Sequence, residues 1–321
     1  MTFTEKAAGE MKLRLRSEID RARESANESE RAHLEHALTE LEAAHIGTIH
    51  ALCAELLRER PIEAKVDPQF LAADETTQDR LYDEAFDGWF GHVLSDPPEG
   101  VRRVLRKRSR DRDHGGPRAI LRKAGWQLVG QRDFDGKWRR EPFAREREMD
   151  RLLEQLRRLA DVYPRAHERE CFLAQNLSYV WRVTNEIDRR ELIDLVRDYD
   201  GIEEELRKLL RERSWGWSGG PREFAPGVSK AGVLEQRTLA KAALGAFLEK
   251  ADADLAACLH ADLESLVASY TQLKDASGKL DFLDLLVVAR NLIVHDRAVR
   301  DELQRKYTHI LVDEFQDTNR L

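Results

Sequence analysis

Two adjacent carboxylates, Asp313 and Glu314, follow a short apolar run over residues 309–312. Such a run is typical of a buried strand in a parallel sheet, whose carboxyl end is the edge at which nucleotide sites form. In phosphoryl transfer, one acid at that edge can hold Mg²⁺ while a second orients or deprotonates the attacking water. The same dipeptide also occurs in solvated turns after strands, so by itself it leaves both interpretations open.

The residues around this pair make the pattern more specific. Positions 312–319 read Val-Asp-Glu-Phe-Gln-Asp-Thr-Asn, and this string resembles the Walker B motif of the UvrD/RecB-like superfamily 1 DNA helicases. The resemblance implies that Asp313 ligates the Mg²⁺ of MgATP and that Glu314 activates water, with Gln316 as a further catalytic residue. It also implies that Asp313, Glu314 and Asp317 belong to the nucleotide site.

Two segments near the start of the sequence resemble the DNA-contacting motifs of the same helicases. Residues 2–11 read Thr-Phe-Thr-Glu-Lys-Ala-Ala-Gly-Glu-Met, and residues 47–53 read Gly-Thr-Ile-His-Ala-Leu-Cys. The resemblance implies a strand followed by a helix in each segment, with DNA contacts from Thr2, Phe3, Thr4, Lys6, Thr48 and His50. The ring of Phe3 is suited to stacking on a base, but a core position under the sheet would suit it almost equally.

Two further segments indicate a branch of the family. Residues 55–68 most resemble the RecB and AddA helicase-nucleases, which process double-strand breaks. Residues 280–286 resemble the helix just before Walker B, although Leu283 stands where that branch usually has Asp. The resemblance therefore implies an ATP-dependent 3′–5′ translocase of DNA repair and recombination. Its partners would be single-stranded and duplex DNA and a second helicase-nuclease subunit.

The phosphate-binding loop of such enzymes has no match in this sequence. A P-loop needs G-x-x-x-x-G-K-[ST], but the two Gly-Lys pairs, Gly136-Lys137 and Gly278-Lys279, are followed by Trp138 and Leu280. In the family the P-loop precedes the segment at Thr2, and a second RecA-like core follows Walker B. We therefore expect an internal piece of a larger helicase. ATP and Mg²⁺ would serve the intact parent, and neither would bind this piece tightly or support hydrolysis.

Composition excludes several other classes of protein. Charged residues make up 35% of the chain, and its longest apolar stretches are interrupted by charges, which predicts no membrane span. The charged start does not resemble a signal peptide. The three cysteines, Cys53, Cys171 and Cys258, are scattered without metal-binding spacing and indicate core or half-buried thiols of a cytoplasmic protein.

The net charge is −7, from 53 Lys and Arg against 60 Asp and Glu, so any DNA-binding surface must be local. The strongest basic run comprises Arg102, Arg103, Arg106, Lys107, Arg108, Arg110, Arg112, Arg118, Arg122 and Lys123. One interpretation is a solvated helix face with a loop over residues 111–117. The other is an arm that contacts duplex DNA, by analogy with the accessory domain of these helicases.

The pattern of apolar residues predicts an α/β protein that is mostly helical. We expect a partial RecA-like P-loop NTPase core with a parallel sheet at residues 1–70 and 275–321, and a large all-α accessory domain inserted at 71–274. Helices are predicted over 5–25, 34–44, 50–60, 77–94, 146–159, 168–181, 186–198, 202–212, 234–250 and 255–273. Trp215 and Trp217 lie in a Gly-rich break, where they could stack on bases or fold back onto their own domain.

Three functions remain open on the sequence. The first is the helicase role just described. The second is a non-catalytic DNA-binding or interaction module derived from such a helicase. The third, an unrelated phosphoryl-transfer enzyme with an acidic strand end, does not account for several family motifs in their family order.

Overall fold

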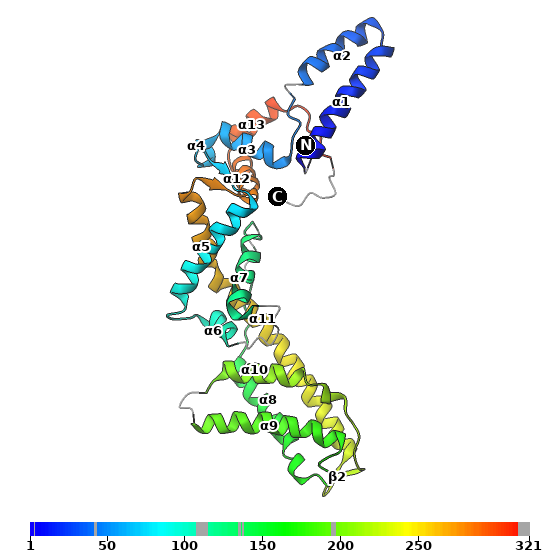
Figure 1. The fold of residues 1–321 in the computed structure, drawn as a ribbon, viewed down its shortest axis with the longest axis vertical. Coiled ribbons are helices and arrows are strands. Elements are labelled where there is room, and N and C mark those ends of the chain that lie inside the picture. Colours follow the sequence, from blue (N-terminus) through cyan, green and yellow to red (C-terminus); the bar gives the residue numbers. More distant parts are fainter. Residues whose placement is uncertain are drawn as a thin grey trace. The chain divides into compact units, whose positions relative to one another are not determined.

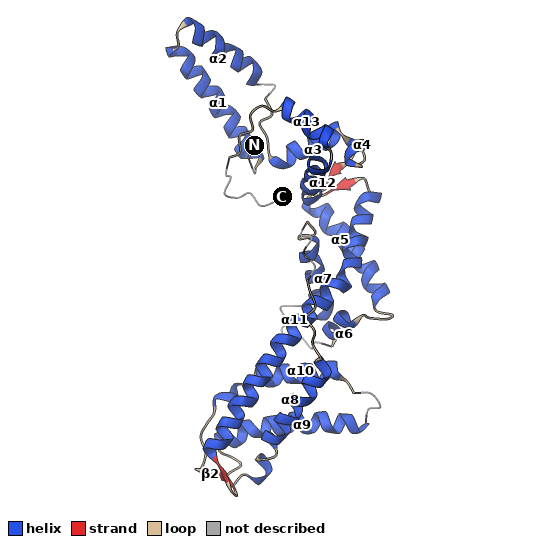
Figure 2. Cartoon of the chain, turned by 180° about the vertical axis from the view of Figure 1, so that it is seen from behind, coloured by secondary structure: helices blue, strands red, loops and turns tan. Residues whose placement is uncertain are grey.

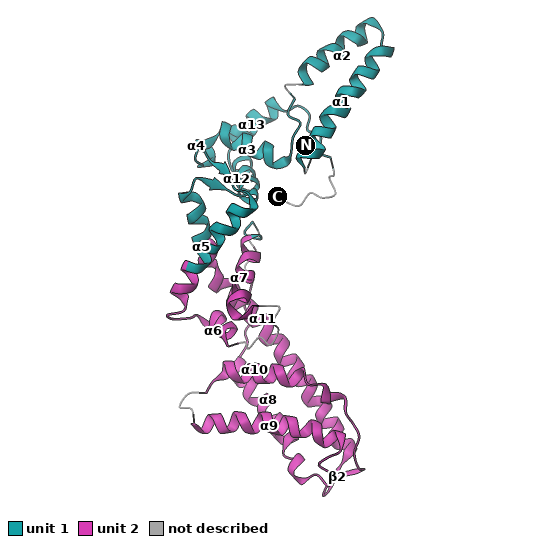
Figure 3. Ribbon diagram, in the orientation of Figure 1, with its two compact units in different colours: residues 1–87, 130–134, 268–321 teal, residues 88–129, 135–267 magenta. Residues whose placement is uncertain are grey.

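The computed structural model describes residues 1–2, 4–41, 44–106, 115–133, 136, 138–193 and 197–313. The chain divides into two compact units (Figure 3). Unit 1 comprises residues 1–87, 130–134 and 268–321, and unit 2 comprises residues 88–129 and 135–267. Helices dominate the described residues (Figure 2), which confirms the prediction of a mostly helical chain. None of the described helices is long and apolar enough to cross a lipid bilayer.

Unit 1 contains a helical hairpin, a short parallel pair of strands and a small helical core (Figure 1). Its elements are α1 (Glu5–Ser25), α2 (Glu28–Leu41), α3 (Ile49–Glu59), α4 (Pro61–Ala64), β1 (Leu71–Ala72), β4 (Lys279–Leu280), α12 (Phe282–His295) and α13 (Arg297–Lys306). The unit also takes most of α5 (Glu75–Val93) and the last residues of α11 (Lys230–Ala276).

The core of unit 1 lies between α3 and α12. Leu57 of α3 is fully buried, and the apolar positions Leu285, Ala289 and Leu292 of α12 recur at helical spacing and are buried with it. Strands β1 and β4 pair in parallel, with Leu71 opposite Lys279. Parallel pairing is therefore present in a mostly helical unit, whereas the RecA-like identity of this core stays a prediction.

Unit 2 is built almost entirely from helices. Its elements are α6 (Glu99–Leu105), α7 (Gly116–Val129), α8 (Arg145–Ala160), η2 (Tyr163–Arg165), α9 (Phe172–Ile193), α10 (Tyr199–Leu210), η3 (Arg213–Gly216), β2 (Glu223–Ala225), β3 (Val228–Ser229) and the first part of α11. Helices α8, α9, α10 and α11 share one apolar core, to which Leu153, Leu177 and Leu206 contribute fully buried side chains.

Two pairs of predicted helices are single helices in the structure. The predicted helices 168–181 and 186–198 form one helix, α9, and 234–250 and 255–273 lie within the 47-residue α11. Polar residues made the sequence look broken, but their side chains are satisfied inside the helices. Thr184 donates to the carbonyl of Val180 at 3.2 Å, and Asp254 accepts hydrogen bonds from two arginines.

The Gly-rich break with two tryptophans folds back in part. Trp215 is buried and donates from its indole Nε1 to the carbonyl of Leu209 at 2.6 Å, so this ring is a core residue. Trp217 is 41% exposed and meets the ring of Phe172 edge-on at a centroid distance of 5.7 Å. The cysteines are free thiols, half-buried at Cys53 and Cys171 and buried at Cys258, as predicted.

Candidate functional site

Three segments far apart in the sequence pair through their backbones in unit 1. The amide of Thr2 donates to the carbonyl of Gly47, and the amide of Ile49 donates to the carbonyl of Thr2, both at 3.1 Å. These two bonds make a parallel bridge between Thr2 and Thr48. The amino group of Met1 donates to the carbonyl of Leu311 at 2.7 Å, and the amide of Asp313 donates to the carbonyl of Met1 at 2.9 Å.

The second pair of bonds has the form of a parallel ladder, in which one residue bonds the residues on either side of its partner. Met1 and Thr2 therefore lie between residues 47–49 and residues 311–313. We call this arrangement the three-segment junction. It brings the starts of α1 and α3 and the first acid of the Asp-Glu pair to one place in unit 1.

The strand predicted at residues 309–312 is only partly realised. These residues form no regular strand, and Ile310 and Leu311 are 62% and 82% exposed. Their backbone bonds run to Met1 alone among the described residues. A buried strand needs neighbours on both edges and cover on both faces, so the prediction of burial is wrong for this structure, whereas the parallel direction agrees with it.

Two threonines in or near the junction each cap a helix. Thr4 is the N-cap of α1, where its Oγ1 accepts from the amide of Ala7 at 3.1 Å, and Thr48 is the N-cap of α3, where its Oγ1 accepts from the amide of Ala51 at 3.1 Å. The Thr48 hydroxyl also donates to Oε1 of Glu5 at 3.0 Å. Helix N-termini carry a partial positive charge that favours phosphate groups, so the junction presents two such ends.

The remaining predicted DNA residues differ in accessibility. Thr2 is fully buried, and its Oγ1 has no hydrogen-bond partner among the described residues, so its side chain does not face solvent. Thr4 is exposed, and Lys6 is exposed with its ammonium 4.0 Å from Glu10. His50 is half-buried, and this burial lowers its pKa below the ordinary value, which favours the neutral ring at pH 7.

The structure exposes an aromatic ring to which the sequence assigned no role. Phe282, the first residue of α12, is 46% exposed and meets the ring of His50 edge-on at a centroid distance of 5.1 Å. Helical spacing from Leu285 would place Phe282 in the core, but its position at the helix end leaves much of the ring in solvent. An exposed aromatic beside a neutral imidazole can stack on a nucleotide base.

The acidic end of the site is described only at its first residue. The side chain of Asp313 is exposed, and a carboxylate at the end of a parallel-paired segment has the donor chemistry that Mg²⁺ prefers. Phe3, Glu314, Gln316 and Asp317 lie outside the described residues, as do Lys107, Arg108, Arg110 and Arg112 of the basic run.

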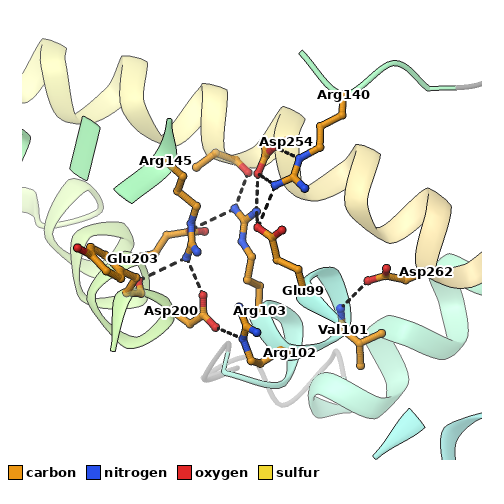
Figure 4. Close-up of polar contacts among 12 residues, drawn as sticks. Glu99, Val101, Arg102, Arg103, Arg140, Arg145, Asp200, Glu203, Asp254 and Asp262 are labelled. Atoms are coloured by element: carbon orange, nitrogen blue, oxygen red, sulfur yellow. Dashed lines mark hydrogen bonds and ion pairs between the residues drawn. The ribbon is translucent and has the colours of Figure 1, made fainter. Parts of the chain in front are cut away.

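The described arginines at the start of the basic run belong to an ion network inside unit 2 (Figure 4). Arg103 is 3% exposed and donates to Asp254 at 2.7 Å and to Glu203 at 3.1 Å. Arg102 donates to Asp200 at 2.8 Å, and Arg145 bridges Asp200 and Glu203. Carboxylates of unit 2 thus already neutralise these charges, which weakens the interpretation of this part of the run as a DNA-binding arm.

The same network accounts for a group that resembles a metal site. Glu99, Asp254 and Cys258 place ligand atoms within 4.8 Å of one another. Arg103 and Arg140 already bind the Asp254 carboxylate, and burial raises the pKa of Cys258 to about 11. A protonated thiol and carboxylates held by arginine make a poor metal site, so this cluster is an ion-pair network.

Comparison with protein families gives a match to the UvrD/REP helicase N-terminal domain over residues 1–321. The chain belongs to this family. The match confirms the family resemblance found in the sequence.

Relatives of this helicase domain cover nearly all of the chain. An ATP-dependent helicase/nuclease subunit of Streptococcus suis is 26% identical over an alignment of 353 residues that spans 99% of this chain. The protein of the same name from Oceanobacillus iheyensis is 23% identical, and the exonuclease/helicase subunit RexA of Lactococcus lactis subsp. cremoris is 22% identical, each over 99% of this chain. The chain spans 28–29% of the length of these three relatives.

Proposed function

We propose that the chain forms the DNA-contacting and Walker B side of the ATP-binding core of a DNA helicase. The three-segment junction is the observation that carries this proposal. In the junction the backbone of Met1 and Thr2 bonds both the residues next to Thr48 and the segment that ends at Asp313, which supports a DNA site and a nucleotide site side by side. A helicase must link nucleotide hydrolysis to movement along DNA, and a shared backbone junction is a short physical route between the two sites.

In this proposal, DNA lies along the starts of α1 and α3. The exposed Thr4 and Lys6 offer a hydroxyl and a charge to phosphates at the positive end of α1. Thr48 supports this surface through its bond to Glu5, and His50 and Phe282 supply rings for a base. Thr2 acts through its backbone, since its side chain is buried.

The nucleotide side would use the acids that follow the junction. Asp313 would hold the Mg²⁺ of MgATP, and Glu314 would orient the attacking water, with Gln316 and Asp317 linking this site to the DNA motifs. When bound, Mg²⁺ neutralises charge on the phosphates during transfer. The 321 residues contain no P-loop sequence, so ATP and Mg²⁺ would bind tightly only in an intact parent protein.

The names of the relatives extend the proposal to the whole protein. They are called helicase/nuclease subunits, and we infer a parent that translocates 3′–5′ on single-stranded DNA and opens duplex DNA during double-strand-break repair. A second helicase-nuclease subunit would be its protein partner.

Direct binding measurements test the DNA side of this proposal. Fluorescence anisotropy with a labelled oligo(dT) should show binding by the 321-residue chain. Removal of a stacking ring costs about 1–3 kcal/mol, so Phe282→Ala should weaken affinity by roughly 5-fold to 150-fold. Lys6→Ala should weaken binding and reduce its dependence on salt.

A matched control separates local contacts from bulk charge. Lys241, an exposed lysine of α11 in unit 2, carries the same charge as Lys6, and Lys241→Ala should leave affinity unchanged. If Lys6→Ala and Phe282→Ala both bind oligo(dT) like the unmodified chain, the junction is not the DNA site.

A further inference from the structure

A compact cluster of charges surrounds the start of α12. Lys274 has a side chain 1% exposed, with its ammonium 2.7 Å from Asp281 and also paired with Asp284. Arg132 lies 2.7 Å from Asp284 and is also paired with Asp281. Tyr270 donates its hydroxyl to Asp281 at 3.2 Å. Two cations thus balance two carboxylates inside unit 1.

The same two carboxylates begin the helix. Asp281 is the N-cap, and its side chain accepts from the amide of Asp284 at 2.9 Å, while the Asp284 side chain accepts from the amide of Asp281 at 2.9 Å. This capping box is complete without any cation. Arg132 and Lys274 are therefore not needed to start the helix, although burying them carries a desolvation cost.

The cluster lies next in sequence to Phe282, the residue whose ring meets His50. Phe282 lies directly after the N-cap Asp281, so the carboxylates that hold the first turn flank it in the sequence. Burial alone would raise the pKa of Asp281, but the charges of Arg132 and Lys274 and their hydrogen bonds lower it to about 2. Both carboxylates of the first turn are thus engaged by fixed cations at neutral pH.

We propose that Arg132 and Lys274 are positioning residues, which hold the first turn of α12 so that Phe282 stays against His50 in place for a nucleotide base. The inference rests on the proposed function of the junction for its ligand, single-stranded DNA. Buried ion pairs often fix geometry more than they stabilise the fold. Arg132 belongs to the short segment Gly130–Phe134, which the chain contributes to unit 1 between two stretches of unit 2.

The position of the ring can be measured without DNA. In the 321-residue chain with ¹³C-labelled histidine, the imidazole signals of His50 sense the ring of Phe282, and Phe282→Leu gives the position of these signals without that ring. Arg132→Met should move the His50 signals toward the Phe282→Leu position, whereas Arg132→Lys, which keeps the charge, should largely restore them. A folded Arg132→Met chain with unchanged His50 signals would overturn the inference.

A control at the other end of α12 excludes general loosening of the helix. Arg300 donates to the carbonyls of Ile293 and Val294 near the end of α12, so Arg300→Met removes a charged contact to the same helix. It should leave the His50 signals in place, and movement equal to that of Arg132→Met would count against the inference. If Arg132→Met does not fold, Lys274→Met removes the other cation of the cluster without changing the capping box and serves the same test.

Binding to oligo(dT) then separates this inference from the proposed function. Arg132→Met should weaken binding when Phe282 is present and add little in a Phe282→Leu background. If Phe282→Leu leaves binding intact while Arg132→Met still moves the ring, the DNA role fails and the positioning of the ring stands. If Phe282→Leu weakens binding but Arg132→Met neither moves the ring nor alters binding, the positioning role fails and the DNA role stands.

Discussion

The backbone amide of Asp313 donates a hydrogen bond to the carbonyl of Met1 across 2.9 Å. The residue after Met1 is bridged in turn to Thr48. One short length of backbone, Met1 and Thr2, therefore lies between Asp313 and Thr48, the N-cap of α3. Changes that disturb this length are expected to affect the nucleotide side and the DNA side together.

The buried hydroxyl of Thr2 should contribute nothing to stability. Its Oγ1 has no partner among the described residues, so Thr2→Val removes an uncompensated polar group and should leave the unfolding free energy of unit 1 unchanged or raise it by about 1 kcal/mol. Thr48→Val removes the cap of α3 and should lower it by about 1–2 kcal/mol. The unfolding free energy of each variant is measured in urea, with hydrogen exchange of the α3 amides as the reporter. Equal losses of unfolding free energy in Thr2→Val and Thr48→Val would contradict this account.

Acid should weaken unit 1 through Asp281. Its pKa is lowered from 3.8 to about 2 in the folded chain, so the folded state binds its proton less tightly than the unfolded state. The resulting stabilisation, about 2 kcal/mol, is complete above about pH 5 and is lost as pH falls toward 2. Asp281→Asn should abolish this part of the pH dependence. The exposed Asp301→Asn should not, and a wild-type slope in Asp281→Asn would contradict the assignment.

The ion network of unit 2 should depend on its buried member. Arg103→Met removes the buried cation shared by Asp254 and Glu203, while Arg140 and Arg145 still bind these carboxylates, and should destabilise unit 2 by about 1.5–3 kcal/mol. Arg102 is paired with Asp200 but its side chain is 51% exposed, so Arg102→Met should cost less than about 1 kcal/mol. Thermal unfolding, monitored by hydrogen exchange of the α8 and α10 amides, compares the two variants. Similar losses of stability in Arg103→Met and Arg102→Met would contradict this prediction.

Hydrolysis of ATP by the 321 residues should stay at background. No segment of this sequence matches the phosphate-binding loop, and Asp313 with Glu314 cannot by themselves hold the β and γ phosphates. A coupled assay with MgATP and oligo(dT) checks this, with Glu314→Gln as the control for contaminating enzymes. Turnover that Glu314→Gln abolishes would contradict the prediction.

Apolar spacing predicted most of the helices and short motifs predicted the family, because both are local signals, whereas α6, α7 and α13 were not predicted. The burial of Thr2 and the exposure of Phe282 depend on which segments meet, and a single sequence does not show that. The continuity of α11 was hidden because Asp254 looks like a break until Arg103 and Arg140 are known to bind it. The partners of Asp281 were equally hidden, since Arg132 is remote in sequence.

The central claim is that DNA binds where the three segments meet. Hydrogen exchange of the 321-residue chain, measured with and without saturating oligo(dT), tests it most directly. We predict slower exchange in the first turns of α1, α3 and α12, near Lys6, His50 and Phe282, with unchanged exchange in the core of α9. Protection confined to unit 2, or none in these three turns when DNA is bound, would contradict the claim.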